Sequence, residues 1–333
     1  MTAPLVTIVV PVLNEADNLE RLVARLDGVL AGLPVRSEIV FVDDGSTDQT
    51  LAAIKRANAR DGRIRALSLS RNFGKEIAIA AGLRTARGEA AVIIDADLQH
   101  PPELIADFIA RWREGYQVVY GQRLERETDS VPRRLFARAY YRLFNALVRT
   151  DIPEGAGDFR LLDRRAIDAM NTFRETQRFN KGLFSWIGFR AIGVPYTVAE
   201  RTAGSSKWSL RRLARFALDG LTSFSTLPLR VWSLLGLAVS LSAFGYVAVF
   251  LVKTLILGID VPGFPTLIIA IMFFSGVQLI SLGVIGEYLG RVYEEVKARP
   301  LYIVAEEVGA PDAAPAKATE TAARPAARTR ETT

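Results

Sequence analysis

Two long stretches without a charged residue constrain this chain more than any other feature. Val231–Val252 has 22 residues and Phe264–Gly286 has 23, and neither contains Asp, Glu, Lys or Arg. At about 1.5 Å per helical residue, each would cross a hydrocarbon layer about 30 Å thick. A buried helical hairpin of a large soluble protein is the alternative, but soluble folds rarely bury uncharged runs of this length. The sequence therefore predicts two transmembrane helices within residues 229–290.

Basic residues flank these two stretches on their outer sides. Arg211, Arg212, Arg215 and Arg230 precede the first stretch, Arg291, Lys297 and Arg299 follow the second, and Lys253 lies between them. The positive-inside rule then puts both ends of the chain in the cytoplasm. We expect a multi-pass protein of the inner or plasma membrane, with a cytoplasmic domain in residues 1–228, a cytoplasmic segment in 291–308 and a disordered tail in 309–333.

The first third of the chain alternates between short apolar runs and segments of helical periodicity. The predicted strands are Val6–Val10, Glu38–Val42, Ala66–Leu69 and Ala90–Ile94, and the predicted helices are 19–30, 49–59 and 75–86. Such alternation is typical of an α/β fold with a mostly parallel sheet and helices on both faces. Ligands of these sheets bind beyond the carboxyl ends of the strands.

The composition limits the chemistry that the chain can perform. It has no cysteine and one histidine, His100, which excludes disulfides, thiolate catalysis and His-cluster metal sites. Any protein ligands to a metal are then oxygens, which suit Mg or Mn. The net charge of +6 is concentrated in residues 111–215, which indicates phosphate or anionic lipid as the partner. The sequence shows no basic recognition helix and no base-stacking motif that would predict nucleic-acid binding. His100 itself is expected to face solvent.

The sequence Asp95-Ala96-Asp97-Leu98-Gln99 directly follows the last of these strands. Two carboxylates where a strand ends can converge on a divalent cation, which can neutralise a diphosphate leaving group. Acidic pairs at strand ends are also common in turns and caps, so the context matters. Pro11–Glu15 and Val42–Asp48 end the first two strands, so their polar groups lie at the same edge of the sheet. Their carboxylates could hold a ribose and a base.

These motifs resemble the family 2 glycosyltransferases of the GT-A fold. The shared segments are PVLNE, VDDGSTD, SRNFGKEIAIAAGL, DADLQHPPE, GAGDFRLLDR and RTAGSSKWSLRRL, and they span about Pro4 to Arg299. Within the family, this combination is similar to the polyprenyl-phosphate hexose transferases, which include dolichyl-phosphate mannosyltransferase and bactoprenol glucosyltransferase. The resemblance implies a Rossmann-like GT-A domain joined to a two-helix transmembrane hairpin.

The resemblance also implies a role for individual residues. Asp95, Asp97 and Gln99 would hold the metal and the diphosphate, while Pro11, Asn14, Glu15, Asp43, Asp44, Asp95 and Ala96 would line the nucleotide. Asp158 would face the acceptor in the position of the catalytic base, and Asp97 would share in catalysis. Arg123, Arg133, Arg201, Ser205 and Lys207 would bind the acceptor phosphate and the donor diphosphate.

The implied reaction transfers a hexose from a UDP-glucose or GDP-mannose type of donor to polyprenyl phosphate, with inversion and with Mg or Mn. A lipid phosphate is largely ionised at neutral pH because its second pKa is about 6. Asp158 could therefore accept a residual proton or orient the acceptor. A processive polysaccharide synthase is one alternative, although its Gln-x-x-Arg-Trp motif is missing, and a noncatalytic membrane scaffold that binds nucleotide is another.

Two further segments have amphipathic patterns. Arg134–Arg149 and Leu210–Leu227 are predicted to lie in the headgroup layer as interfacial helices. A helix that packs on the sheet and exposes a basic face to solvent would have the same pattern as Arg134–Arg149. The identity of the sugar and base, the isoprenoid length and homo-oligomerisation stay open, and flipping of the product is expected to need a separate protein.

Overall fold

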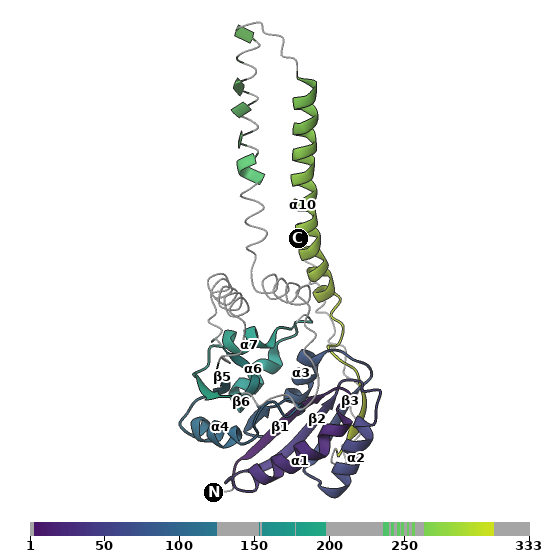
Figure 1. Cartoon of the computed structure of the whole chain (residues 1–333), viewed down its shortest axis with the longest axis vertical. Helices are drawn as coiled ribbons and strands as arrows, with labels where there is room; N and C mark the ends of the chain where they lie inside the picture. The colour runs from purple at the N-terminus through teal and green to yellow at the C-terminus, as the bar shows by residue number, and fades with distance from the viewer. Residues whose placement is uncertain are drawn as a thin grey trace, which may run out of the picture.

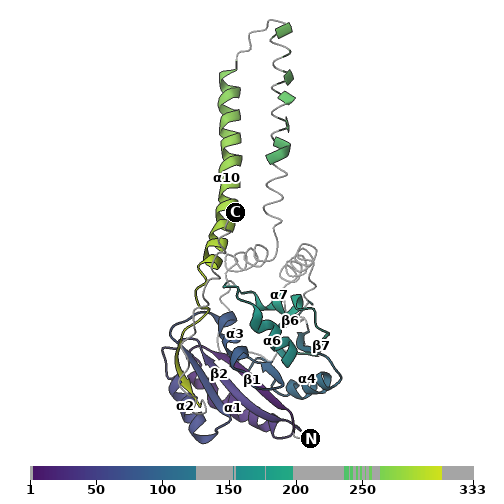
Figure 2. The ribbon, with the colours of Figure 1, turned by 180° about the vertical axis from the view of Figure 1, so that it is seen from behind.

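The computed structural model describes residues 3–124, 153, 155–176, 178–197 and 263–309, with a few helical residues between 236 and 256. Its elements in chain order are β1 (Leu5–Val12), α1 (Ala16–Leu30), β2 (Arg36–Asp43), α2 (Thr50–Arg60), β3 (Ile64–Leu69), α3 (Lys75–Thr85), β4 (Ala90–Ile93), α4 (Leu104–Arg113), β5 (Val118–Arg123), β6 (Ala156–Asp163), α6 (Arg164–Thr172), α7 (Asn180–Trp186), β7 (Ala191–Tyr196), α10 (Phe264–Val296) and β8 (Val304–Val308). Together they form an α/β domain from which α10 projects (Figures 1 and 2).

The strands form one mixed sheet in the order β7-β5-β6-β4-β1-β2-β3-β8. Four neighbouring pairs are parallel, namely β1 with β2, β1 with β4, β2 with β3 and β5 with β7, and three are antiparallel. The prediction of a mostly parallel sheet is therefore confirmed for β1 to β4, and the sheet as a whole is mixed because β6 and β8 run against their neighbours. A run of apolar residues predicts that a strand is buried, and it carries no information about the direction in which that strand enters the sheet.

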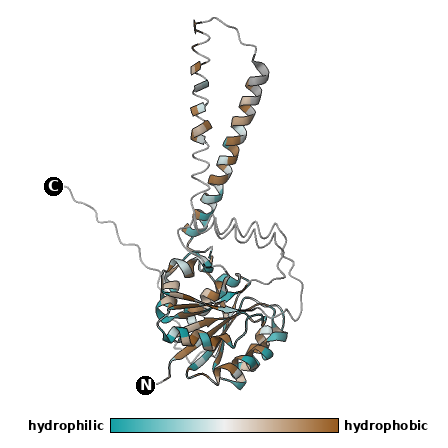
Figure 3. Ribbon diagram, turned by 60° about the vertical axis from the view of Figure 1, so that its left-hand side comes forward, coloured by the Kyte–Doolittle hydropathy of each residue, from teal (hydrophilic) through white to brown (hydrophobic). Residues whose placement is uncertain are grey.

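Helices cover both faces of the sheet, as the sequence predicts. On one face α1, α2 and α4 pack against side chains such as Ile8 and Phe41, and on the other α3, α6 and α7 pack against Val9 and Val40. Because both faces are covered, the central strands are apolar almost throughout, and Figure 3 shows this hydrophobic centre.

Helix α3 is buried along most of its length, which fixes the position of its first residues. Every residue from Ile77 to Leu83 is buried. Gly82 allows the close approach, because a Cβ atom there would collide with the side chain of Val9 on β1. This packing holds the start of α3, with Lys75 and Glu76, at the carboxyl edge of the parallel strands.

The C-terminal part leaves the α/β domain and returns to it. Helix α10 begins at Phe264, as predicted for the second span, and continues ten residues beyond the predicted end at Gly286. The segment 291–308, which is expected to be cytoplasmic, completes α10 and supplies β8, and β8 pairs antiparallel with β3. Among the described residues, one helical stretch, Phe273–Val296, is long and apolar enough to cross a membrane, and it is not buried in the protein.

Several predictions fall outside the described residues. These are most of the first span, Val231–Val252, the two amphipathic segments Arg134–Arg149 and Leu210–Leu227, and the tail beyond Gly309. The two-helix hairpin and the interfacial helices therefore stay predictions.

Candidate active site

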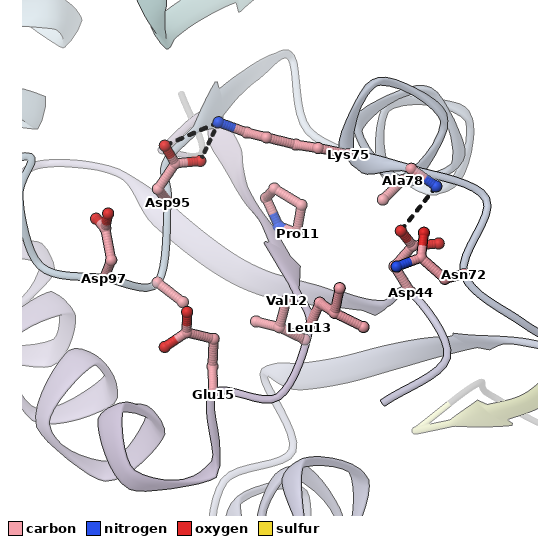
Figure 4. Close-up of a pocket in the computed structure, with 12 residues that line it drawn as sticks. Pro11, Val12, Leu13, Glu15, Asp44, Asn72, Lys75, Ala78, Asp95 and Asp97 are labelled. Carbon is pink, nitrogen blue, oxygen red and sulfur yellow. Dashed lines mark hydrogen bonds and ion pairs between the residues drawn. The ribbon is translucent and has the colours of Figure 1, made fainter. Parts of the chain in front are cut away.

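A pocket of about 360 Å³ opens at the carboxyl ends of β1, β2 and β4. It is lined by Pro11, Val12, Leu13, Glu15, Asp44, Asn72, Gly74, Lys75, Ala78, Asp95, Ala96 and Asp97. In Figure 4, Asp95, Asp97 and Glu15 lie at one end of this pocket, Asp44 and Asn72 at the other, and Pro11 between them. Six of the expected nucleotide and metal residues therefore share one cavity, at the edge where ligands of parallel sheets bind.

Asp44, one of the expected nucleotide residues, makes hydrogen bonds that shape one wall of the pocket. Asp44 is buried and accepts from the backbone N–H groups of Phe73 at 2.7 Å and Gly74 at 2.8 Å, which fixes the loop before α3. Burial raises the pKa of Asp44, and these backbone donors oppose the rise. Asp44 therefore supports the pocket as well as lining it.

Asn14 and Asp43 stabilise the turn after β2 and do not line the pocket. The Oδ1 atom of Asn14 accepts from the backbone N–H of Thr47 at 2.8 Å. Asp43 is buried and accepts from the backbone N–H of Ser46 at 3.0 Å and from the hydroxyl of Ser68 at 2.9 Å. The same turn contains Gly45, whose φ of 74° is in the left-handed region that favours glycine.

Lys75 joins this pocket to Asp158. Its Nζ lies 2.7 Å from Oδ1 of Asp95 and 2.9 Å from Oδ2 of Asp158. Lys75 begins α3, Asp95 follows β4 and Asp158 lies on β6, so the contact needs three separate elements. Figure 4 shows the ammonium reaching Asp95 above the pocket. Sequence reasoning did not select Lys75, although its place where the loop after β3 starts a helix was a signal.

The two carboxylates that contact Lys75 are held in their ionised form. Burial by itself would raise the pKa of Asp95, but the hydrogen bond from His100 and the charge of Lys75 lower it well below its usual range. Burial likewise opposes ionisation of Asp158, and the charges of Lys75 and Lys181 lower its pKa. Lys75 in turn has a raised pKa, because the attraction of both carboxylates outweighs its burial.

His100 is a part of this site, so the expectation that it faces solvent was wrong. Its Nε2 lies 3.4 Å from Oδ2 of Asp95, and its Nδ1 lies 2.8 Å from the hydroxyl of Tyr196. The ring stacks on Phe159 with a centroid separation of 5.1 Å, and 16% of the side chain is exposed. The loop after β4 turns His100 inward because β6 and β7 provide Phe159 and Tyr196 as partners.

The carboxylates of Asp95 and Asp97 are the candidates for holding a divalent cation. The side-chain amide of Gln99 donates to Oδ2 of Asp97 at 2.7 Å, so in the structure Gln99 orients Asp97. Among the described residues, no three His, Cys, Asp or Glu side chains are grouped closely enough to hold a metal by themselves. Mg²⁺ is commonly bound by one or two carboxylates together with substrate phosphates. An all-oxygen pair at the rim of a pocket fits that pattern.

The residues expected to bind the acceptor phosphate and the donor diphosphate are mostly beyond the described residues. Arg133, Arg201, Ser205 and Lys207 all fall there. Arg123 is described, and it lies exposed at the end of β5 with its backbone N–H donating to Gly155 at 3.1 Å.

The chain has extended similarity to known glycosyltransferases. Residues 7–170 match the family described as Glycosyl transferase family 2. The glycosyltransferase sll0501 of Synechocystis sp. is 49% identical over 90% of this chain and 94% of that protein. The glycosyltransferase CsbB of Bacillus subtilis is 44% identical over 92% of this chain and 93% of that protein. The SfII prophage-derived bactoprenol glucosyl transferase of Shigella flexneri is 42% identical over 90% of this chain and 97% of that protein.

These similarities cover almost the full length of each relative, and the acidic pocket lies within the residues that match the family. The chain is therefore a glycosyltransferase, and it belongs to glycosyltransferase family 2.

Proposed function

We propose that this enzyme transfers a hexose from a nucleotide diphosphate sugar to polyprenyl phosphate. The observation that carries the proposal is the contact of one ammonium, that of Lys75, with both Asp95, which lines the pocket, and Asp158, which lies outside it. In this proposal the Lys75 contact would lie at the boundary between the bound donor and the bound acceptor. The 42% identity to a bactoprenol glucosyl transferase over nearly the whole chain supports a polyprenyl phosphate as the acceptor.

The nucleotide diphosphate sugar would occupy the pocket at the ends of β1, β2 and β4. Glu15 and Asp44 would accept hydrogen bonds from the ribose and base, and Pro11 and Ala96 would contact them. Asp95 and Asp97 would hold a Mg or Mn ion, with Asp97 oriented by Gln99. Such an ion, when bound, neutralises charge on the diphosphate leaving group.

We propose direct displacement with inversion. An oxygen of the lipid phosphate forms a bond to the anomeric carbon, and the bond from that carbon to the diphosphate breaks. The lipid phosphate is already mostly ionised, since its second pKa is about 6. Lys75 lowers the pKa of Asp158, so this carboxylate is a weak base. Its role in the proposal is to orient the acceptor, and positioning supplies much of the rate.

The acceptor phosphate must approach an anionic site, so cations have to offset the repulsion. Arg123, Arg133, Arg201, Ser205 and Lys207 would bind the acceptor phosphate and the donor diphosphate. The isoprenoid tail would stay in the bilayer, beside interfacial helices at about 134–149 and 210–227.

The proposed organisation is a cytoplasmic catalytic domain in residues 1–228 anchored by two spans within 229–290. The apolar stretch in α10 supports the second span. Both termini would be cytoplasmic, according to the positive-inside rule. Two spans suit an anchor better than a channel, so flipping of the product would require another protein.

The test uses the full-length chain in lipid nanodiscs with polyprenyl phosphate, Mg or Mn and a panel of nucleotide sugars. The expected product is a lipid-linked monosaccharide, formed with one or two donors from the panel. An Asp97→Asn variant serves as the control for enzyme-dependent turnover. Transfer of sugar only to protein or to a growing polymer would contradict the proposed acceptor.

A further inference from the structure

A second cavity, of about 160 Å³, lies between β5, β6 and α7. Its polar lining includes Tyr120, Arg160, Lys181 and Ser185, and its apolar lining includes Phe184 and Phe189. Arg and Lys provide two positive charges, and the two hydroxyl groups are further hydrogen-bond donors. A cavity with these donors on one side and aromatic rings on the other suits an anion attached to an apolar group.

Arg160 is a buried cation whose charge is incompletely matched. Its side chain is 3% exposed, and its guanidinium lies 3.9 Å from the ring centroid of Phe184. One nitrogen donates to the backbone oxygen of Gly157, but Nε is buried and has no hydrogen-bond partner among the described residues. Burial lowers the pKa of Arg160 to about 10, in spite of nearby Asp158 and Glu76. An anion beside this guanidinium would relieve the cost of a buried, unmatched charge.

The second cavity lies close to Asp158, because Arg160, which lines it, is a near neighbour of Asp158 on β6. Asp158 and Arg160 are two residues apart on β6, so their side chains are on the same face of the sheet. Lys75 lines the donor pocket and pairs with Asp158, while Arg160 lines the second cavity. Lys181, in the first turn of α7, is close enough to lower the pKa of Asp158. The two cavities are thus linked through Asp158.

The negative groups near this cavity do not outweigh its cations. Asp158 already shares the ammonium of Lys75. Glu76 is the other carboxylate near Arg160, and burial raises its pKa, which favours its uncharged form. Arg160 and Lys181 therefore leave a net positive charge facing the cavity.

We propose that this second cavity binds a phosphate group, with Arg160 and Lys181 as its cationic ligands and Ser185 and Tyr120 as hydroxyl donors. The ligand class is a phosphate monoester or inorganic phosphate. The identity of this phosphate rests on the proposed function. In that function, the terminal phosphate of polyprenyl phosphate is held in this cavity, beside Asp158, before the phosphate attacks. The rings of Phe184 and Phe189 then contact the first carbons of the isoprenoid.

The experiment measures binding of inorganic phosphate to the full-length protein in detergent by calorimetry, at constant ionic strength. Lys181 is partly exposed, so Lys181→Met can be made with little risk to folding, unlike a change at buried Arg160. Lys181→Arg restores the charge, and Lys55→Met on α2 is the matched control far from the cavity. Loss of one charged ligand is expected to weaken phosphate binding by about 10-fold or more in Lys181→Met, with recovery in Lys181→Arg.

Steady-state kinetics identify the source of the phosphate. If the lipid is the ligand, Lys181→Met raises the KM for polyprenyl phosphate by a similar factor and leaves the KM for the nucleotide sugar unchanged. In the unaltered enzyme, inorganic phosphate then competes with the lipid. If phosphate binding weakens but the KM for the lipid does not change, the cavity is a site for free phosphate.

The inference and the proposed function can fail separately. Equal phosphate binding by Lys181→Met and Lys55→Met would overturn the phosphate site, even if the enzyme glycosylates polyprenyl phosphate normally. Conversely, phosphate binding that depends on Lys181, in a protein that never transfers sugar to polyprenyl phosphate, would overturn the acceptor assignment and keep the site.

Discussion

The ammonium of Lys75 lies 2.9 Å from Oδ2 of Asp158, so the carboxylate expected at the acceptor side is half of an ion pair. The same ammonium lies 2.7 Å from Asp95. Both carboxylates are mostly buried, and Lys75 lowers the pKa of each. Lys75 therefore keeps two negative groups close together that would otherwise repel each other.

Replacing Lys75 should reduce turnover strongly. In Lys75→Met the repulsion between Asp95 and Asp158 is no longer offset, and we expect kcat to fall about 100-fold, the scale of losing one preorganised charge at a reacting centre. Lys75→Arg keeps the charge and should recover part of the activity. Initial rates for the three proteins, with far-UV circular dichroism as the control for folding, check this. A kcat of Lys75→Met within twofold of that of the unaltered enzyme would show that turnover does not depend on the charge of Lys75 between Asp95 and Asp158.

Asp97 should be needed for metal binding and for turnover. We expect Asp97→Asn to lower kcat by about 100-fold or more, because one of the two candidate metal carboxylates is lost. Binding of Mn²⁺ in the presence of the nucleoside diphosphate, measured by calorimetry, should weaken in parallel. The exposed Asp107→Asn on α4 is the matched control and should behave as the unaltered protein. Equal binding of Mn²⁺ by the two variants would show that Asp97 does not hold the metal.

Glu76 should make the folded state less stable at alkaline pH. Burial raises its pKa from 4.5 to about 7, so between these values the folded chain binds a proton that the unfolded chain releases. The stabilisation is complete below pH 4.5 and is lost as the pH rises through 7. Glu76→Gln keeps an oxygen that can accept the backbone N–H of Asn180, at 2.9 Å from Glu76 in the structure.

The measurement for Glu76 is the thermal midpoint of both proteins at pH 5.5 and at pH 8. Relative to the unaltered protein, Glu76→Gln should gain about 3 °C or more at pH 8, which corresponds to roughly 1 kcal/mol, and should gain less at pH 5.5, where the unfolded chain has begun to release this proton but the folded chain has not. An identical pH dependence in the two proteins would show that Glu76 does not carry this effect.

His100 should act through the position of Asp95. His100→Phe retains the stacking on Phe159 and loses the contacts with Asp95 and Tyr196. We expect kcat to fall about tenfold, as is common when a residue that orients a metal ligand is lost. Tyr196→Phe removes only the contact with Nδ1 and should have a smaller effect. Comparison of kcat for both variants tests this order, and the reverse order would contradict it.

The returning strand β8 should contribute to the stability of the α/β domain. It covers the edge of β3, and Glu306 on β8 lies 2.6 Å from Lys55 on α2. A chain ended after Arg299 exposes that edge, which favours aggregation, and its thermal midpoint should fall by several degrees. A chain ended after Gly309 keeps β8 and should melt as the full-length protein does. Equal midpoints for the two shortened chains would show that β8 adds no stability.

The sequence by itself determined the first four strands and the three helices between them. The predicted strand Val6–Val10 lies within β1, and Ala90–Ile94 ends one residue beyond β4. Apolar runs and helical periodicity are local properties, so they can be read without knowing the fold. The polar clusters after β1, β2 and β4 could also be placed at one edge, because parallel strands point their carboxyl ends the same way.

Only the tertiary structure decided which side chains of the site contact one another. Lys75 and Asp158 are far apart in the sequence, and so are His100 and Tyr196, so no local pattern relates the members of either pair. Their contacts depend on β6 entering the sheet antiparallel to β4 and on β7 pairing with β5. Local sequence sets which residues become strands and helices, whereas the order and direction of the strands depend on burial of the whole core, and the partners at the active site follow from that order.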